Sequence, residues 1–486
     1  MSSLAERSEK LLAKAPMAMV VVPFAMGVFF AEGLDVPLWL LLLLCTVALI
    51  GAIIFKGWRQ IGALGTMLFG IGALIHTLSY GETTPYNQPY DMVLKVATSS
   101  IEREGYTSAE ARIEECENKT LTGRNVVLWG DSLLHLSAGD RVHLAAPIRP
   151  FRAEREAYAR LMHHRRFVGA ISLSHKATYE YIPAPKRTLH DWAVERLRTA
   201  MEPSDARGVV LAMTTGERAE IRNELRQCYS ASGASHLLAV SGLHIGIAFL
   251  LINFLLLPLV LLRYGNVMRS VVAVVLIWCY VWLCGMSPSA VRAAIMFSLL
   301  QVSLSSTREY VSINILAGTA FVMLAFDSHQ LFDISFQLSF IAVAGIILWA
   351  IPLYRLCATR FKAINILLGV LLVGIASTVA TMPLVAKSFA TISLVGVAIN
   401  PIVITLANII VFTGILALAL PSVAVIAEVA AEWQNSVVEW AASLPCGHFD
   451  LSIPSWAMWS IYLLFAGVTI TLLLLPKRKK EPKIEG

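Results

Sequence analysis

The residues best suited to chemistry are two histidines and a serine within residues 230–247, namely His236, Ser241 and His244. Ser241 and His244 are three residues apart, so on a helix their side chains can touch, as a nucleophile and its base must. On one continuous helix, His236 and His244 would be separated by about 12 Å in rise and about 80° in azimuth, so they cannot chelate one metal ion unless the helix breaks at Ser241-Gly242. No acidic residue lies nearby to orient the histidine.

Three interpretations of this cluster stay open. The first is a hydrogen-bonded packing cluster, in which Gly233, Gly242 and Gly246 let helices approach closely. The second is a polar patch that lines a water-filled path through a membrane. The third is an intramembrane nucleophile pair formed by Ser241 and His244, which lacks an evident orienting acid.

A second polar group is Arg292, which lies near the start of an apolar segment in the sequence Ser-Pro-Ser-Ala-Val-Arg-Ala at 287–293. Its side chain would either snorkel to the membrane interface or stand as a cation in a pore. In a pore it would meet a phosphate or an internal carboxylate.

Further polar residues interrupt other apolar segments. Asp333 and Gln337 are four residues apart and form a polar stripe at the outer end of a segment. Asn400 precedes Pro401, and proline in a membrane helix leaves backbone carbonyls that need protein or water as partners. Several such clusters in one bundle favour a hydrated path over packing alone.

The composition predicts the elements that must position these residues. The chain has 486 residues, of which 57% are hydrophobic and only 15% are charged, whereas soluble domains carry about 25% charged residues. A polytopic α-helical membrane protein is the natural class. We find neither a Walker-type phosphate loop nor a metal-site signature of a nuclease or protease, so we expect no enzyme and no cofactor. The seven cysteines have no zinc or redox-motif spacing.

Apolar runs predict about ten to twelve membrane spans. They are 17–33, 36–55, 61–79, 236–262, 270–285, 289–306, 312–327, 334–352, 363–383, 391–419 and 455–475. The distribution of Lys and Arg predicts cytoplasmic N- and C-termini. We expect 391–419 to be broken or re-entrant at Asn400-Pro401, and 421–442 to be an interfacial helix or a buried span.

Residues 81–185 form an extramembrane insert, which this topology puts in the periplasm. Short alternating segments separated by turn residues predict five strands, near 91–98, 111–115, 125–129, 141–145 and 170–174. A small β-barrel of the OB type is the first expectation. The domains are therefore N-terminal spans at 1–80, the insert, amphipathic interfacial helices at 186–229, a channel domain at 230–476 and a basic tail at 477–486.

Arginine and aromatic residues alternate at the end of the insert, a pattern that suits single-stranded nucleic acid. The candidate DNA-binding residues are Arg149, Arg152, Arg155, Tyr158, Arg160, Arg165 and Arg166. The competing interpretation is a solvated helix over the barrel edge with Glu–Arg pairs. Residues 186–229 predict two amphipathic helices split near Pro203, which lie at the membrane interface or pack inside the protein.

Several stretches together resemble the ComEC family of competence proteins. The sequence from His236 to Gly246 resembles the family's hallmark, and 287–293 resembles its next conserved stretch. Phe336-Gln-Leu-Ser-Phe340 and the series Pro383, Phe389, Ser393 and Asn400 are similar to later ones. The resemblance covers residues 208–475 well and 17–185 loosely.

This resemblance implies an inner-membrane channel that passes one DNA strand into the cytoplasm during natural transformation. It implies a periplasmic DNA receptor and a cytoplasmic translocation motor as partners, besides single-stranded DNA and membrane lipids. Many members also end in a metallo-β-lactamase-like domain; its absence before Gly486 predicts no nuclease activity here, and a separate nuclease would act. The family's usual stretch after the barrel strands is replaced by the arginine-rich segment. A transporter or exporter of another hydrophilic solute is the alternative, followed by an intramembrane Ser–His hydrolase.

Overall fold

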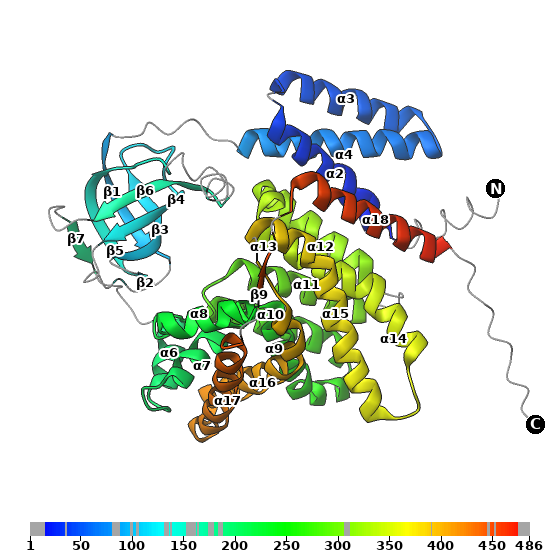
Figure 1. Cartoon of the computed structure of the whole chain (residues 1–486). Helices are drawn as coiled ribbons and strands as arrows, with labels where there is room; N and C mark the ends of the chain where they lie inside the picture. Colours follow the sequence, from blue (N-terminus) through cyan, green and yellow to red (C-terminus); the bar gives the residue numbers. More distant parts are fainter. Residues whose placement is uncertain are drawn as a thin grey trace, which may run out of the picture.

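The computed structural model of the chain consists of N-terminal helices, a β-sheet domain and a larger helical body (Figure 1). It describes residues 15–34, 36–79, 88–97, 101–103, 106–130, 136, 139–151, 162, 165–173, 179–182, 188–305, 312–389, 391–444, 448–451 and 453–474.

Three helices come first among the described residues, as the first three apolar runs predict. They are α2 (Pro16–Gly33), α3 (Leu38–Ile54) and α4 (Trp58–Ser79). Both α2 and α3 pack along α4. A Cβ on Gly72 would lie 2.2 Å from the carbonyl oxygen of Phe24, so α2 and α4 touch backbone to backbone. Glycine permits this approach because it has no side chain.

The described residues of the insert form a seven-stranded mixed sheet. Its strands are β1 (Pro89–Val96), β2 (Ile101–Arg103), β3 (Tyr106–Cys116), β4 (Asn125–Gly130), β5 (Arg141–Pro147), β6 (Phe167–Leu173) and β7 (Tyr179–Ile182). The order is β6-β4-β3-β1-β5-β7, with β2 paired to β3. All five predicted strands are present, and the shorter β2 and β7 are additional.

This sheet curls because one face buries a core. Side chains of β1 and β5 alternate between buried and accessible positions, and the buried ones share a single apolar cluster. An isolated antiparallel bridge joins Arg149, just after β5, to Ala170 on β6. The insert is therefore a half-barrel with a filled interior.

Three short helices follow, where two were predicted. They are α6 (Leu189–Arg198), α7 (Asp205–Thr214) and α8 (Asn223–Ala231). The additional break follows α7 at Gly216, whose φ of 88° is easily adopted by glycine. Their apolar residues form one core with helices α16 (Leu394–Ala419) and α17 (Ala424–Ala442). Of the two predicted alternatives, packing inside the protein is therefore the one that the apolar sides of these helices follow.

The remaining helices form the membrane body. They are α9 (Gly242–Leu255), α10 (Gly265–Leu283), α11 (Pro288–Ser305), α12 (Ser312–Phe326), α13 (Ile334–Gly345), α14 (Ile351–Cys357), α15 (Lys362–Phe389) and α18 (Ser455–Leu474). A π-helical segment, Ile346–Ala350, joins α13 to α14. Among the described residues, six helices are long and apolar enough to cross a membrane, and five shorter helices are also apolar. This confirms a polytopic helical membrane protein, while the count of ten to twelve spans stays a prediction.

Two predicted spans differ in detail. The expected break at Asn400-Pro401 is wrong, because α16 runs through Pro401 without interruption. Proline removes one backbone N–H, and a long helix held by neighbours tolerates that loss. The run 236–262 is also wrong as one helix, since its α-helical part is confined to α9 and short 3₁₀ segments flank it.

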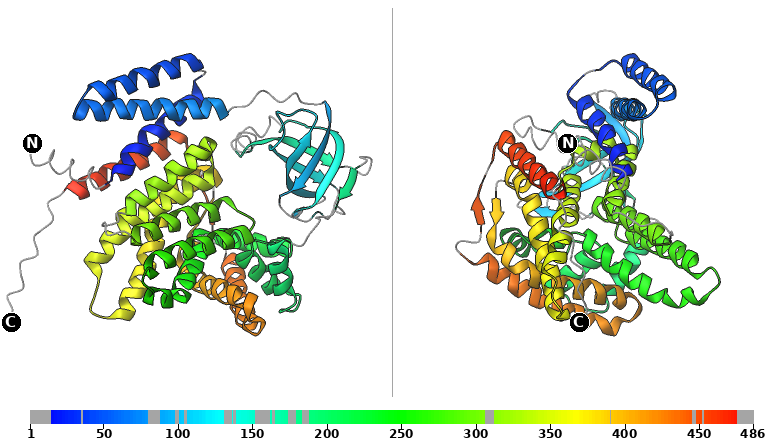
Figure 2. Two further views of the ribbon diagram at one scale, coloured as in Figure 1. Left: turned by 180° about the vertical axis from the view of Figure 1, so that it is seen from behind. Right: turned by 90° about the vertical axis from the view of Figure 1, so that its right-hand side faces the viewer.

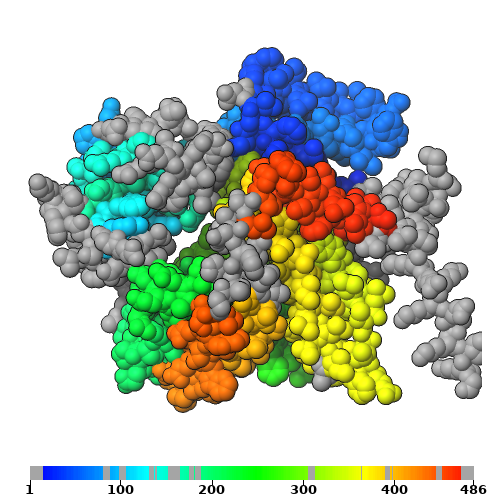
Figure 3. Space-filling model, viewed as in Figure 1, coloured from blue at the N-terminus to red at the C-terminus, as the bar shows by residue number. Residues whose placement is uncertain are grey.

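The sheet domain and the N-terminal helices project from different sides of the helical body (Figure 3). Helix α14 and the end of α18 lie on the side away from the sheet, in front and rear views (Figures 1 and 2). Helix α17 packs on α7, α8 and α16 and leaves Ile426, Val429, Trp433 and Trp440 exposed. Exposed tryptophans beside aliphatic residues are typical of a membrane interface.

Candidate functional site

The stretch with His236, Ser241 and His244 changes conformation within itself. A 3₁₀ turn, Ser235–Leu238, is followed by extended backbone, and α9 begins at Gly242 with Ser241 as its N-cap residue. The chain thus breaks at Ser241-Gly242, the one place where the sequence analysis allowed a break, so the separation calculated for a continuous helix does not apply. His236 is exposed, His244 has no exposed surface, and the two rings interact electrostatically.

Ser241 and His244 do contact each other, but through the backbone. The Ser241 backbone N–H donates to His244 Nδ1 at 3.2 Å. Because Nδ1 accepts, the neutral ring carries its proton on Nε2. That nitrogen is buried and has no hydrogen-bond partner among the described residues. A serine nucleophile needs its hydroxyl on the base, so this contact describes a helix cap and gives no support to the hydrolase alternative.

The start of α9 lies against the start of α11. A Cβ on Gly246 would lie 3.2 Å from the Phe297 ring, and one on Gly242 would lie 3.9 Å from Ala293. The Ser289 hydroxyl also donates to the carbonyl of Val240. Small residues thus bring the two helices together at the same level.

Arg292 lies where α11 contacts α13. Only 2% of the residue is exposed, and its Nη2 donates to the Ser335 hydroxyl at 2.7 Å. Its Nε and Nη1 have no hydrogen-bond partner among the described residues. Asp333 interacts with it electrostatically and caps α13 by accepting from the Phe336 N–H at 3.0 Å. Arg292 therefore does not snorkel; it is a buried cation with unused donors.

Three helix N-termini adjoin one another here. The contacts above link α9 to α11, and Arg292 links α11 to α13. Each helix N-terminus carries a partial positive charge of about half a unit and exposes unpaired N–H groups. Together with the guanidinium, and offset in part by Asp333, this row favours an anion.

The other predicted residues lie around this row. Gln337 donates to the Leu331 carbonyl at 2.8 Å and stabilises the turn before α13. His244 is about 200° from Gly242 around α9, so it faces away from α11. Asn400 is on α16, which packs against α9, and its side-chain oxygen is buried without a partner among the described residues. The structure thus joins Arg292 to Ser335 and Asp333, and places His244 on another face.

The arginine-rich segment is described only in part. Arg152, Arg155, Tyr158 and Arg160 lie outside the described residues. The others of this set are Arg149, Arg165 and Arg166.

Each of these three arginines has a different environment. The Arg149 side chain is exposed. Arg165 pairs with Glu110 at 3.2 Å. Arg166 pairs with Asp327 at 3.1 Å and so joins the sheet domain to the helical body. Two of the predicted DNA-binding arginines are therefore already paired with carboxylates.

A buried polar network was missed by the sequence analysis. His76 donates to or accepts from the Ser328 hydroxyl through Nδ1 at 2.9 Å, and its Nε2 lies 2.8 Å from a Glu32 oxygen. Ser79 contacts both Ser328 and His329 at 3.2 Å. An ionisable residue inside an apolar span is by itself a signal of such a network, and both Glu32 and His76 carry it.

A titratable histidine lies outside the spans, beside the C-terminal end of α10. His190 Nδ1 bonds to the Leu283 carbonyl at 2.8 Å, and Nε2 lies 3.8 Å from Glu217. Burial alone would lower the pKa of His190, but the bonds to Glu217 and Leu283 outweigh it and raise the pKa above its ordinary value. This contact joins α6 to the end of α10.

Comparison with known proteins places this site within one family. The family model described as "Competence protein" matches residues 213–478. ComE operon protein 3 of Bacillus subtilis is 26% identical over 285 residues, covering 57% of this chain and 35% of that protein. An uncharacterized protein of Aquifex aeolicus is 27% identical over 68% of this chain and 72% of its own length. No solved structure matches.

A shorter match is to the uncharacterized protein YcaI of Escherichia coli, which is 27% identical over 34% of this chain and 22% of its own length. The chain thus spans about a third or less of two of these relatives. The family match covers more than half of this chain and includes α9, α11 and α13 with the row of helix N-termini. The chain therefore belongs to the Competence protein family, the ComEC family that its sequence resembles.

Proposed function

We propose that this chain is an inner-membrane channel that passes single-stranded DNA into the cytoplasm during natural transformation. The observation that carries the proposal is Arg292, a buried cation with two unused donor nitrogens beside three helix N-termini. Burying a charge with unmet donors is costly, so such an arrangement is retained where a ligand completes it. A phosphodiester backbone supplies one anionic group per nucleotide.

Accessible residues lie beside Arg292 and in the segment around the start of α9. Ser335, which binds it, is exposed, as are His236 and Gly242 at the start of α9. Arg292 itself is shut off from solvent, so this arrangement corresponds to a closed channel. Conduction requires α11 and α13 to separate enough for a phosphate to replace Ser335 as the partner of Arg292.

The sheet domain would receive the strand on the periplasmic side. We propose an OB-like barrel, because β4 and β6 are parallel neighbours and the remaining neighbouring pairs are antiparallel. Exposed Arg149 offers a phosphate contact there. The role of the arginine-rich segment in DNA binding is part of this proposal.

The positions of basic residues support an orientation of the protein in the membrane. Lys56 and Arg59 flank the α3–α4 connection, and Arg355 and Arg360 flank the end of α14, on the side away from the sheet (Figure 1). Cytoplasmic loops are rich in such residues. This orientation puts the sheet in the periplasm and both termini in the cytoplasm. A DNA receptor and a translocation motor on the two sides are proposed as partners.

The test is complementation of a chromosomal deletion. Arg292→Gln keeps a polar side chain without the charge, Arg292→Lys keeps the charge without the planar donors, and Arg355→Gln removes an exposed arginine of α14 as the control. A charged hydrogen bond contributes about 1.5–3 kcal/mol, so transformation by linear DNA should fall at least about tenfold in Arg292→Gln. Arg355→Gln should transform normally.

Membrane abundance of each variant is measured by immunoblot, so that loss of protein is separated from loss of transport. Normal transformation by Arg292→Gln at normal abundance would refute the role of this arginine. Normal transformation by the deletion itself would refute the uptake function, and vesicle uptake of small hydrophilic solutes would then test the transporter alternative.

A further inference from the structure

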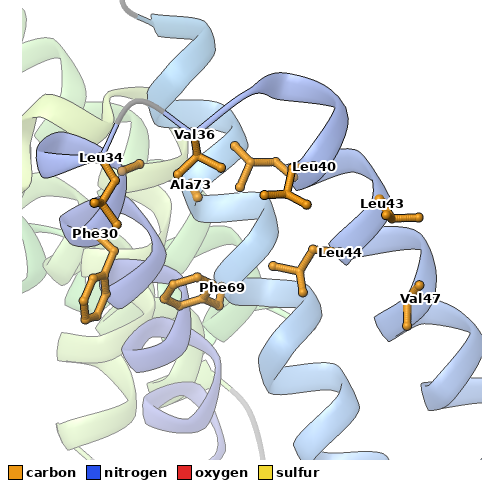
Figure 4. A pocket seen from close by; sticks show the side chains of 11 residues that line it. Phe30, Leu34, Val36, Leu40, Leu43, Leu44, Val47, Phe69 and Ala73 are labelled. Carbon is orange, nitrogen blue, oxygen red and sulfur yellow. The ribbon is translucent and has the colours of Figure 1, made fainter.

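A groove of about 460 Å³ lies between the N-terminal helices, outside the part of the chain that the family match covers. Its lining is wholly hydrocarbon and comes from α2, α3, α4 and the connection between α2 and α3. The lining residues are Phe30, Ala31, Leu34, Val36, Leu40, Leu41, Leu43, Leu44, Val47, Phe69 and Ala73 (Figure 4). Its volume is within the range of small-molecule sites, about 300–1,000 Å³.

The groove exists because α2 and α3 diverge. Each packs along α4, but the described residues of α2 and α3 make no comparable contact with each other. Figure 4 shows Phe30 and Leu34 on one wall, Leu40 to Val47 on the other, and Phe69 and Ala73 between them. The result is a V-shaped groove with α4 as its floor.

Two different faces of α3 explain this arrangement. Leu41, Ala48 and Ala52 are buried, and Cys45 lies so close to α4 that a Cβ on Gly70 would be 2.6 Å from its sulfur. The neighbouring face presents four leucine and valine side chains at helical spacing to the groove, from Leu40 to Val47. This second face therefore needs a partner that α2 does not supply.

The surroundings identify the chemistry of that partner. Helices α2 and α4 are long and apolar enough to span a membrane, and α3 is a shorter apolar helix. Phe30, Leu43 and Val47 are about half exposed, so the groove opens outward. A void of this kind would forfeit the dispersion contacts of every side chain that lines it. Membrane hydrocarbon is the material at hand to fill it.

The length and the apolar lining of the groove suit a hydrocarbon chain. From Leu40 to Val47 the groove runs about 10 Å, which is two-thirds of one leaflet of about 15 Å. Along that length the accessible lining has no polar surface, so a chain lying in the groove meets hydrocarbon alone.

We propose that this groove binds an acyl chain of a membrane phospholipid and that the chain forms part of the packing between α2 and α3. Hydrocarbon gains little by moving from lipid to apolar protein, so shape and packing determine occupancy. The site is therefore expected to hold one chain in preference to the moving lipid around smooth helix faces. The proposal is independent of DNA transport.

The experiment uses the full chain in vesicles of phosphatidylethanolamine and phosphatidylglycerol that contain a phospholipid with a mid-chain diazirine. After irradiation, labelled peptides are identified by mass spectrometry. The internal reference is the exposed aliphatic stripe of α10, formed by Val267, Val271 and Val275. Labelling should be concentrated on α2 and α3 lining peptides and exceed that of the α10 stripe.

Two variants fill the groove, Leu44→Trp at its centre and Val47→Trp at its end, and Val271→Trp is the matched control on α10. Groove labelling should fall to the level of the stripe in either filled variant and stay unchanged in the control. Equal labelling of groove and stripe, or groove labelling that survives both variants, would overturn the proposal. Cross-links between two copies of the chain through the groove would overturn it as well, because they would identify a protein occupant.

Discussion

Replacing His76 by phenylalanine tests the buried network that joins the N-terminal helices to the connection before α13. The change keeps a ring of similar size and removes both ring nitrogens, which contact Glu32 and Ser328. The bond to the carboxylate contributes about 1.5–3 kcal/mol and the bond to the hydroxyl about 0.5–1.5 kcal/mol. His76 has no exposed surface, so water cannot replace either bond. We expect a loss of about 2–4 kcal/mol in the free energy of unfolding.

The assay is reversible unfolding in detergent or lipid discs, with Leu78→Ala on the exposed side of the same helix as control. The decisive measurement is a double-mutant cycle with Glu32→Ala. Because both changes remove the same contact, their combined cost should be smaller than the sum by about 1–3 kcal/mol. Additive costs would show that His76 and Glu32 contribute independently and would refute the network.

Two further predictions follow from other contacts. The pKa of His190 is raised, so its pair with Glu217 stabilises the docking of α6 fully below the ordinary histidine pKa of 6.5, and the stabilisation is lost as the pH rises through the higher pKa of the folded state. The amides of α6 should therefore be better protected from hydrogen exchange at low pH, after correction for intrinsic exchange rates. Glu217→Gln should flatten this dependence of protection on pH. Gly72→Ala should destabilise the protein by about 1–3 kcal/mol through overpacking against the α2 backbone, as thermal unfolding would measure, whereas Gly62→Ala, which meets nothing, should not.

Each contrary result would refute one of these two contacts. Protection of α6 that is independent of pH, or unchanged pH dependence in Glu217→Gln, would contradict the assigned ion pair. Equal stability of the two glycine variants would contradict the close approach of α2 and α4.

Much of the architecture could be predicted because the helices and strands follow from the local pattern of apolar and polar residues. Apolar runs gave the helices of the membrane body, and alternating segments gave the five main strands. Breaks were harder. Pro401 does not interrupt α16, because neighbouring helices hold the helix through its missing hydrogen bond. Conversely, no proline or charge in the sequence signals that α9 begins only at Gly242. That start is marked by the bond from the Ser241 backbone N–H to His244.

The candidate site was predictable in residue type and not in grouping. Arg292 and Asp333 stood out because charge is rare in apolar segments. That they meet through the ends of α11 and α13, while His244 faces elsewhere, depends on which helices pack side by side. Arg165 and Arg166 resembled free DNA contacts in sequence, yet their carboxylate partners, Glu110 and Asp327, are far away along the chain. Pairings at such separations leave no local pattern.

The connection from Asp327 to Ser335 has a consequence for how the protein responds as a whole. Asp327 binds an arginine of the sheet domain, Ser328 binds His76 of the N-terminal helices, and Ser335 binds Arg292. Nine residues thus share three partners in three separate units. Any rearrangement that releases Arg292 alters the free energy of the other two contacts. If Arg292 binds an anion as proposed, a ligand on the sheet that favours one arrangement of this segment changes the affinity of Arg292 for that anion, and by reciprocity the anion changes the affinity of the sheet for its ligand by the same factor.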